Sequence, residues 1–317
     1  MKDTFEREIT YLRISLTDLC NLRCTYCMPP EGVKKQEHRQ ILSLEEIEEI
    51  AREAVGMGVQ KIRLTGGEPL VRRGMLSLCW KLKQIPGLRE LALTTNGLLL
   101  PQMAGELKKA GVDRVNISLD TLDPERYRQI TRGGRLEDAL AGIQAAKDVG
   151  LTPLKLNCVL IGGFNDDEIP ALALLTEREM VEVRFIELMP IGDTVGFAPE
   201  AYLPCEAVLE RLPQLERLPE DSGVAERYRL PGAAGTIGLI RPLSRCFCDR
   251  CNRIRLTADG RLKPCLHSRE EIPIRGLHGE ALRQQMEKAI LHKPEQHGEL
   301  SARLRSEADR NMNQIGG

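Results

Sequence analysis

Residues 10–17 read TYLRISLT, and polar and apolar side chains alternate along this stretch. Because successive side chains of a β-strand point to opposite faces, Arg13, Ser15 and Thr17 would share one face, and the intervening leucines and isoleucine the other. The stretch predicts a strand with one polar and one apolar face. A cysteine-rich loop, residues 20–27, follows it almost directly.

The same pattern recurs downstream, with short strands alternating with amphipathic helices. Further strands are predicted at 61–66, 90–96, 114–120, 153–161 and 182–189. Helices are predicted between them at 43–57, 74–84, 101–110, 136–149 and 166–178. Repeated βα units predict parallel strands with right-handed crossovers, arranged either as a doubly wound sheet or as a barrel.

The polar strand faces favour the barrel. Strands of a doubly wound sheet meet helices on both sides and read as continuous apolar runs. Here one face of the first five strands is polar, through Arg13, Ser15, Thr17, Arg63, Thr65, Thr94, Asn96, Asn116, Ser118, Asp120, Lys155 and Asn157. We predict an α/β fold, an incomplete (β/α)6 TIM-like barrel with an interior site for a polar ligand. The alternative is a closed core in which these side chains satisfy one another.

After residue 189 the βα rhythm ends. A short helix near 204–212, a hairpin at 226–241, a cysteine block at 246–265 and a helical tail are predicted. We therefore expect a barrel at 1–189 and a smaller C-terminal region at 190–317.

The composition excludes several classes of protein. The 317 residues carry 45 Lys and Arg against 46 Asp and Glu, and 3% are aromatic. Balanced charge and few aromatic side chains argue against a nucleic-acid-binding protein. No stretch of about 18 apolar residues and no apolar N-terminal segment is found, so we expect neither a membrane span nor a signal peptide, and predict a cytoplasmic protein.

Two groups of cysteines are candidate metal ligands. Cys20, Cys24 and Cys27 have the spacing C-x3-C-x2-C. Three thiolates on a four-iron cluster leave one iron open to a substrate or cofactor, whereas a structural zinc site needs four ligands and no fourth Cys or His is near.

The second group is Cys248, Cys251 and Cys265, with the spacing C-x2-C-x13-C. Cys246 lies two residues upstream and offers a fourth ligand. This spacing alone therefore leaves both an iron–sulfur cluster and a zinc knuckle open.

Two further features indicate a charged small-molecule ligand. Arg253 and Arg255 alternate within a basic stretch at 241–263, and a planar, permanently charged guanidinium suits phosphate contacts. The second strand is followed by Gly66, Gly67 and Glu68, where the glycines permit close backbone approach to a ligand and the carboxylate can receive an ammonium group.

The cysteine motif with Tyr26 and the downstream GGEP resemble the radical S-adenosylmethionine (SAM) superfamily. Over nearly its whole length the chain resembles the GTP 3′,8-cyclase family of molybdenum cofactor biosynthesis. The matching stretches are RISLTDLCNLRCTYCMP, IRLTGGEPLVRR, LTTNG, NISLD, RFIELMPIG, FCDRCNRIRLTADGRLKPCL and QIGG. Cys246 is not part of that family's pattern.

The resemblance implies a lyase with two [4Fe-4S] clusters and SAM. It assigns Cys20, Cys24 and Cys27 to the first cluster and Cys248, Cys251 and Cys265 to the second. Residues expected around SAM are Tyr26, Gly67, Glu68, Ser118 and Met189. Residues expected around GTP are Arg13, Arg63, Thr94, Lys155, Arg253, Ile254 and Arg255. Catalytic roles are expected for Arg253, Arg255, Gly316 and Gly317. Gly316 and Gly317 belong to a terminal tail that is expected to reach into the active site.

The implied reaction is radical cyclisation of GTP. A 5′-deoxyadenosyl radical derived from SAM removes the ribose H3′, and the resulting carbon radical adds to C8 of guanine. The product is (8S)-3′,8-cyclo-7,8-dihydroguanosine 5′-triphosphate. Expected partners are a reductant of unknown identity, a downstream cyclic pyranopterin monophosphate synthase and a second copy of the chain in a homodimer, with no membrane or nucleic acid.

Two alternatives remain at this point. A radical SAM enzyme that modifies a peptide also carries an auxiliary cluster, although the basic strand face fits a triphosphate better. A non-catalytic metal-binding or nucleic-acid-binding protein with a zinc knuckle belongs to a different class.

Overall fold

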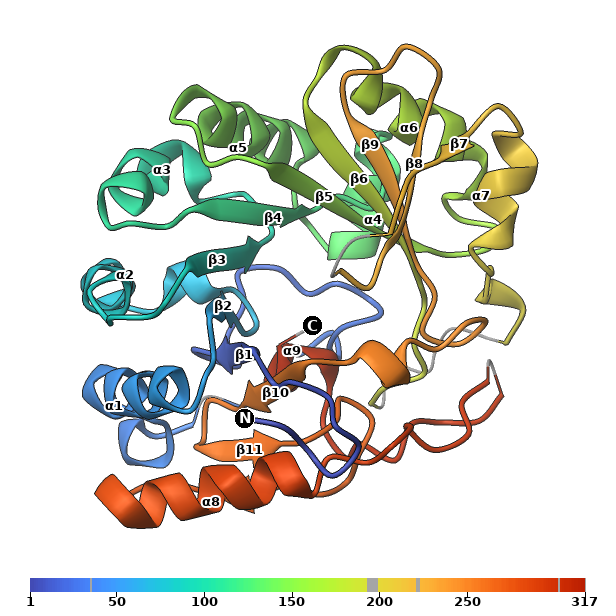
Figure 1. The fold of residues 1–317 in the computed structure, drawn as a ribbon. Helices are drawn as coiled ribbons and strands as arrows, with labels where there is room; N and C mark the ends of the chain where they lie inside the picture. Colours follow the sequence, from blue (N-terminus) through green and yellow to red (C-terminus); the bar gives the residue numbers. More distant parts are fainter. Residues whose placement is uncertain (35, 193–198, 221–222, 302, 317) are drawn as a thin grey trace.

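The computed structural model describes residues 1–34, 36–192, 199–220, 223–301 and 303–316. Their strands are β1 (Tyr11–Ser15), β2 (Lys61–Thr65), β3 (Glu90–Thr95), β4 (Arg114–Ser118), β5 (Leu154–Leu160), β6 (Val181–Glu187), β7 (Glu216–Arg217), β8 (Glu226–Arg229), β9 (Thr236–Ile240), β10 (Arg253–Leu256), β11 (Arg261–Lys263) and β12 (Ile272–Pro273). They form a twelve-stranded sheet in the order β12-β11-β10-β1-β2-β3-β4-β5-β6-β9-β8-β7 (Figure 1).

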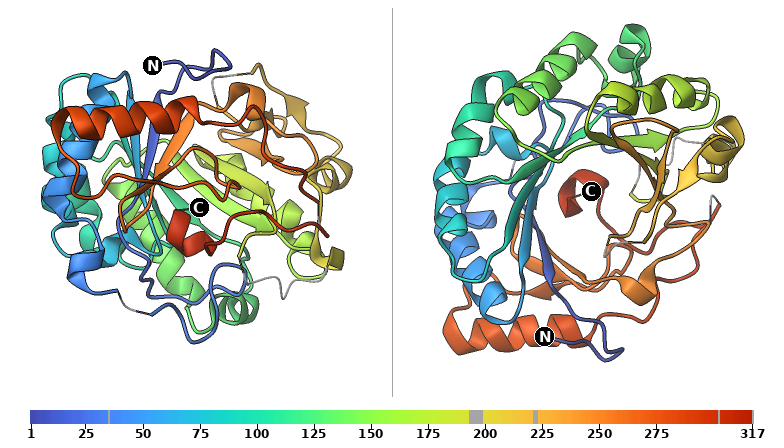
Figure 2. Two further views of the ribbon diagram at one scale, coloured as in Figure 1. Left: turned by 90° about the horizontal axis from the view of Figure 1, so that it is seen from below. Right: turned by 45° about the horizontal axis from the view of Figure 1, so that its top comes forward.

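The sheet is a partial barrel, as predicted. Strands β1 to β6 are parallel, and β10 and β9 extend this parallel run beyond β1 and β6. In the described part of the chain the end strands β12 and β7 do not pair with each other, so the sheet curves without closing (Figure 2). The two added parallel strands come from the region after residue 189 and were not predicted as members of this sheet.

The predicted helices are confirmed. They are α1 (Leu44–Gly56), α2 (Met75–Lys83), α3 (Leu100–Lys109), α5 (Leu136–Asp148) and α6 (Ile169–Arg178), followed by α7 (Glu206–Arg211), α8 (Gly279–Leu291) and α9 (Met312–Ile315). The sequence analysis missed α4 (Pro124–Thr131), although Asp123 caps its first turn by accepting from the Arg126 amide at 2.8 Å and proline at the first position is favourable there.

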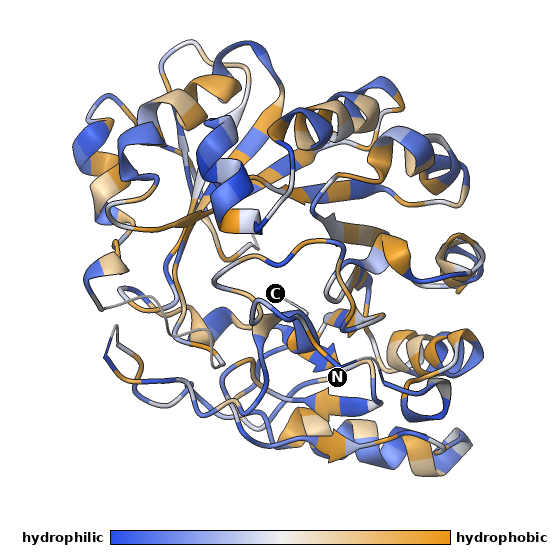
Figure 3. Cartoon of the chain, turned by 180° about the vertical axis from the view of Figure 1, so that it is seen from behind, coloured by the Kyte–Doolittle hydropathy of each residue, from blue (hydrophilic) through white to orange (hydrophobic). Residues whose placement is uncertain are grey.

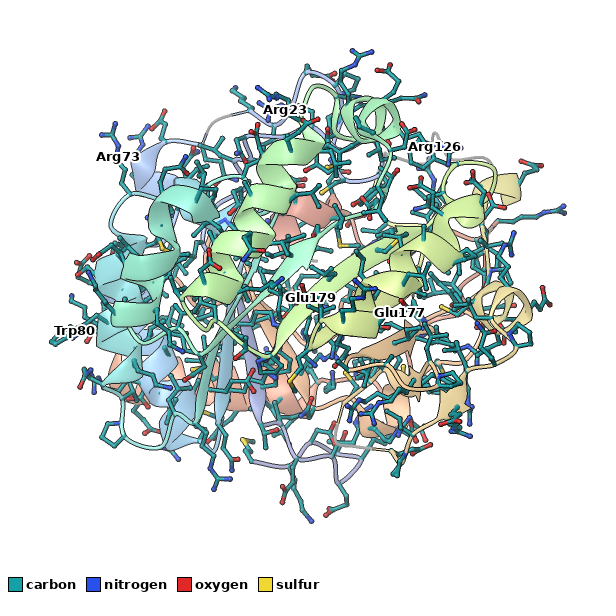
Figure 4. The ribbon with its side chains drawn as sticks, turned by 90° about the horizontal axis from the view of Figure 1, so that it is seen from above. Arg23, Arg73, Trp80, Arg126, Glu177 and Glu179 are labelled. Atoms are coloured by element: carbon teal, nitrogen blue, oxygen red, sulfur yellow. The ribbon has the colours of Figure 1, made fainter. Side chains whose placement is uncertain are left out.

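The helices cover the outer face of the sheet. The apolar side chains of β1, Leu12 and Ile14, are fully buried in the hydrophobic core between sheet and helices, as is Ile117 of β4. Figure 3 shows hydrophilic and hydrophobic residues alternating along strands and helices. On the outside, Arg73 and Trp80 point away from the molecule (Figure 4), and Trp80 is 55% exposed.

The C-terminal tail occupies the barrel interior. Helix α9 lies near the centre of the ring formed by the curved sheet (Figure 2). Its Ile315 is 1% exposed and its Asn313 donates to the backbone oxygen of Asp18 at 2.9 Å. None of the described helices is both long and apolar enough to cross a membrane.

Candidate active site

A cavity of about 760 Å³ lies on the inner face of the sheet. Its lining includes Arg13, Arg63 and Lys155, which were expected on the polar strand faces, and Arg253 and Arg255 of the basic stretch. The alternative of a closed core is therefore wrong, because these side chains surround an open space rather than one another.

Strand register places three of the arginines in one row. Arg13 on β1 pairs with Arg255 on β10 and with Arg63 on β2. Burial and the charge of Arg255 lower the pKa of Arg13 to about 9, and burial with the charge of Arg253 lowers that of Arg255 to about 10. The positive charges of these arginines repel one another, which lowers the stability of the folded chain. A bound anion would relieve this repulsion, so the row favours anion binding.

A second row lies two residues earlier on the same strands. Tyr11 pairs with Arg253 and with Lys61. Burial alone would raise the pKa of the Tyr11 hydroxyl, but the charges of Arg63, Arg13 and Arg253 lower it to about 7. A phenol perturbed in this direction reports a strongly positive potential.

Several cations of this cavity escaped the sequence analysis. Lys61 and Arg114 each stand two residues before an inward-facing residue, so strand periodicity alone would have found them. In the described chain, nine cationic side chains line the cavity, against the acidic Glu90 and Asp113. Lys155 donates to Glu182 at 2.7 Å, while burial and the charge of Arg184 lower its pKa to about 8.

Polar atoms without partners also face the cavity. Among the described residues, no hydrogen-bond partner is found for Arg63 Nε, Arg253 Nε, Asn116 Nδ2 or Asn157 Oδ1. Buried polar groups are normally hydrogen-bonded, so these atoms fit a polar ligand.

Two residues expected around GTP lie outside this lining. Ile254 is 3% exposed and packs in the hydrophobic core, so only its backbone is available to a ligand. Thr94 on β3 pairs with the cavity residue Asn116.

The first cysteine triad lies in the loop beyond the carboxyl end of β1. The Cys20 sulfur accepts from the Leu22 amide at 3.3 Å and from Asn96 Nδ2 at 3.8 Å. All ten cysteines belong to the described residues and are free thiols. Three free thiols on one loop, with amide donors aimed at one sulfur, fit three ligands of an iron–sulfur cluster.

The GGEP loop packs directly on this cysteine loop. A Cβ at Gly67 would collide with the Leu19 backbone oxygen, and the Gly67 amide donates to Thr17 O at 2.7 Å. Glycine is therefore needed for contact between two loops of the chain itself.

Glu68 is held within the chain. It is 1% exposed and accepts from Leu70 N, Thr95 Oγ1 and Asn96 N. Burial raises its pKa to about 7 despite these donors. The carboxylate thus ties the end of β2 to the end of β3.

The other residues expected around SAM surround the same end of the barrel. The Tyr26 hydroxyl donates to Asp120 Oδ2 at 2.6 Å. Ser118 ends β4, and Met189, just after β6, lines the cavity. Asp120, which also accepts from Val159 N at 2.9 Å, is the partner that orients Tyr26.

The second triad lies at the opposite edge of the sheet. Cys251 precedes β10, which runs parallel to β1, so it lies at the amino end of the strands. Lys293 donates to the backbone oxygens of Arg253 and Pro264 at 2.9 and 2.8 Å. This buried lysine holds the segments of Cys251 and Cys265 side by side, and free thiols so placed fit a second cluster beside the cavity.

The tail approaches the cavity from the first-triad side. Arg255 Nη1 donates to Gly316 O at 2.6 Å and to Ile315 O at 3.3 Å. A Cβ at Gly316 would collide with Thr65 Oγ1, so glycine is required there. Gly317, also expected in the active site, lies outside the described residues.

These features lead to the class of protein. The model of the radical SAM superfamily matches residues 14–176, so the chain belongs to that superfamily. A second model, Molybdenum Cofactor Synthesis C, matches residues 181–299.

Full-length relatives define the particular family. GTP 3′,8-cyclase of Alkaliphilus oremlandii is 50% identical over 321 residues and covers all of both chains. GTP 3′,8-cyclase of Moorella thermoacetica is 53% identical over 281 residues, 87% of each chain. The chain belongs to the GTP 3′,8-cyclase family, which confirms the resemblance, the enzyme class and the predicted SAM and iron–sulfur cofactors.

Solved structures agree on the fold. Streptococcus suis SuiB bound to its precursor peptide SuiA has a TM-score of 0.64 and 14% identity, covering 92% of this chain and 67% of that one. At this identity the likeness concerns the fold alone. The relatives do not favour the peptide-modifying alternative, and the hypothesis of a non-catalytic zinc-knuckle protein is wrong.

Proposed function

We propose that this chain converts GTP to (8S)-3′,8-cyclo-7,8-dihydroguanosine 5′-triphosphate in molybdenum cofactor biosynthesis. The observation that carries the proposal is the strongly cationic cavity between two cysteine triads that lie at opposite ends of the parallel strands. A triphosphate supplies the negative charge that this cavity lacks. Family membership and the Molybdenum Cofactor Synthesis C match support the same reaction.

In this proposal Cys20, Cys24 and Cys27 hold the first four-iron cluster. SAM lies against Tyr26, Gly67, Glu68, Ser118 and Met189. When bound, cluster and SAM supply the radical that removes H3′ of the ribose. The chain orients this end of the site through the Tyr26–Asp120 hydrogen bond and through Glu68, which ties the loops together.

GTP occupies the cavity. Arg13, Arg63, Lys155 and Arg253 bind its phosphates or base from the strands, with Thr94 and the Ile254 backbone beside them. Arg255 holds the tail through Gly316 and also faces the cavity, so it links tail position to substrate position. We assign the catalytic roles to Arg253, Arg255, Gly316 and Gly317, as the family resemblance implies. Holding substrate in one geometry is the chain's main contribution to rate.

Cys248, Cys251 and Cys265 hold the second cluster at the amino ends of the strands. Residues 1–189 then act as the barrel unit and 190–317 as the unit carrying the second cluster and the tail. The two family matches, 14–176 and 181–299, also divide the chain in two, although the second begins at β6, before residue 190.

We further propose a homodimer, an external reductant and a downstream cyclic pyranopterin monophosphate synthase, supported by the family resemblance. A cytoplasmic setting is supported by the ten free thiols, because iron–sulfur ligands need a reducing compartment.

The test is anaerobic turnover of reconstituted protein with SAM, a strong reductant and GTP deuterated at C3′. We expect deuterium in the 5′-deoxyadenosine, formed faster with GTP than without it. Unlabelled 5′-deoxyadenosine would reject H3′ abstraction from GTP.

Iron content tests the two ligand sets separately. Cys24→Ser and Cys251→Ser are each expected to lose about half of the reconstituted iron. Cys79→Ala, which alters a buried core thiol on α2, should keep all of it. Full iron in either triad variant would contradict that triad's assignment.

A further inference from the structure

A second set of metal-ligand side chains lies beside the second triad. The sulfurs of Cys246 and Cys248 and a ring nitrogen of His297 all lie within 4.8 Å of one another. Cys246 is exposed, and the other two are half-buried. Neither Cys246 nor His297 belongs to the C-x2-C-x13-C triad, so the proposed function leaves both without a role.

The hydrogen bonds of His297 prepare it for a metal. Its Nδ1 lies 2.8 Å from Gly298 O, an acceptor, so Nδ1 carries the proton and Nε2 carries the lone pair. Nε2 is buried, and no partner for it is found among the described residues. A histidine held by Nδ1 on a backbone oxygen with a vacant Nε2 is the usual arrangement of a metal ligand.

The backbone around the site is held in place by one arginine. Arg7 donates to Cys248 O at 2.7 Å, to Pro294 O at 2.7 Å and to Glu295 O at 2.8 Å. Asp3 binds the same guanidinium at 2.6 Å in a buried ion pair. Arg7 thereby joins the Cys248 segment to the segment that leads into His297.

The spacing of the donors fits one ion. Zinc bonds of about 2.3 Å to sulfur and about 2.0 Å to nitrogen place tetrahedral ligand atoms roughly 3.5 to 4 Å apart, which small side-chain movements reach from here. The thiolates of a four-iron cluster bind separate irons and therefore stand wider apart. The nearby cations do not oppose a divalent ion strongly, because Arg245 pairs with Glu226 and Arg250 with Glu220.

We propose that Cys246, Cys248 and His297 bind a single Zn²⁺ ion with its fourth position open to water. Binding releases the two thiol protons and leaves the imidazole neutral. Because Cys248 is shared, zinc here and the second cluster exclude each other. The competition between zinc and the cluster rests on the proposed function, in which Cys248 is a cluster ligand. Zinc binding itself does not depend on that function.

The first experiment measures zinc alone. Iron-free, full-length protein carrying serine at Cys20, Cys24 and Cys27 is titrated with Zn²⁺ against a chromogenic chelator, with circular dichroism as a check of folding. We expect one zinc per chain, and at least tenfold weaker binding after Cys246→Ser or His297→Gln. His292→Gln, at an exposed histidine paired with Glu270, is the matched control and should change nothing.

The outcomes are distinct. Cys251→Ser and Cys265→Ser could weaken zinc binding while Cys246→Ser and His297→Gln leave it unchanged. In that case the second triad binds the zinc, and the proposal is overturned. Unchanged zinc affinity in all four variants overturns it as well. Neither result depends on turnover of GTP.

The second experiment measures iron. Zinc-loaded protein with an intact first triad should take up only about half of the usual iron, and Cys246→Ser should remove this block. Without zinc, Cys246→Ser and His297→Gln should keep all of their iron. Loss of iron in either variant would make that residue a cluster ligand and overturn the proposal.

Discussion

Replacing Gly316 with alanine should release the C-terminal tail from the barrel. Gly316 adopts φ 65°, and a Cβ there would collide with Thr65 Oγ1. The docked tail depends on Arg255 Nη1 bound to Gly316 O and on Ile315, which is 1% exposed.

The magnitude follows from these contacts. Left-handed backbone costs an alanine about 1 to 2 kcal/mol, and forcing a methyl group into a packed site costs about 1 to 3 kcal/mol more. Docking gains about 2 kcal/mol from burying Ile315 and about 1.5 to 3 kcal/mol from the charged hydrogen bond, less the entropy of ordering the tail. The substitution therefore removes most of the docking free energy. A loss of only about 2 kcal/mol already corresponds to a roughly thirtyfold larger undocked population.

Hydrogen exchange detects this change without any cofactor. Amides of residues 312–315 should exchange at least about thirtyfold faster in Gly316→Ala than in wild type. Gly276→Ala is the control, because Gly276 has φ 72° and a Cβ there meets no atom within 4 Å. It carries the same backbone cost without the collision. Equal tail protection in the two variants would refute the reasoning.

Three further predictions concern the cavity and the SAM end. Because the charged Lys155 attracts phosphate and its pKa is about 8, GTP affinity should fall as pH rises through about 8, and Lys155→Arg should reduce this dependence in calorimetric titrations, leaving the part that comes from Tyr11. Arg63→Met should weaken GTP binding about 10- to 100-fold yet not lower the melting temperature, since burial makes this charge costly; unchanged GTP affinity would contradict its role. Tyr26→Phe should lower the unfolding free energy by about 1 to 3 kcal/mol through loss of its bond to Asp120, as measured in denaturant. Tyr11→Phe should not when unfolding is measured below the Tyr11 pKa of about 7, where the phenol is protonated and no described residue bonds its hydroxyl. Equal losses would show that the Tyr26 bond is not the cause.

Strand periodicity explains why so much of the fold was predictable. One inward and one outward face per strand placed Arg13, Arg63 and Lys155 in the cavity and Leu12 in the core. The period of two is local and survives folding unchanged. The first cysteine triad was equally predictable, because Cys20, Cys24 and Cys27 lie within one loop.

Long-range pairing was not predictable in this way. The sequences of residues 236–240 and 253–256 do not predict that β9 will pair with β6 and β10 with β1. Pairing between strands so far apart in sequence depends on the packing of the whole fold. Glu68 illustrates the same limit. Its motif predicts a ligand contact but not its hydrogen bonds to Thr95 and Asn96, because these depend on a neighbouring strand.

The pairing of β10 with β1 connects the fold to the chemistry. It places Arg255 beside Arg13 and Arg253 beside Tyr11, while Ile254 packs with Leu12 on the core side. A shift of one residue would turn both arginines into the core and Ile254 into the cavity. The cost of burying two unpaired charges forbids that register. Because Cys251 stands two residues before Arg253, the first residue of this strand, the register that forms the anion-binding row also sets the distance of the second triad from it.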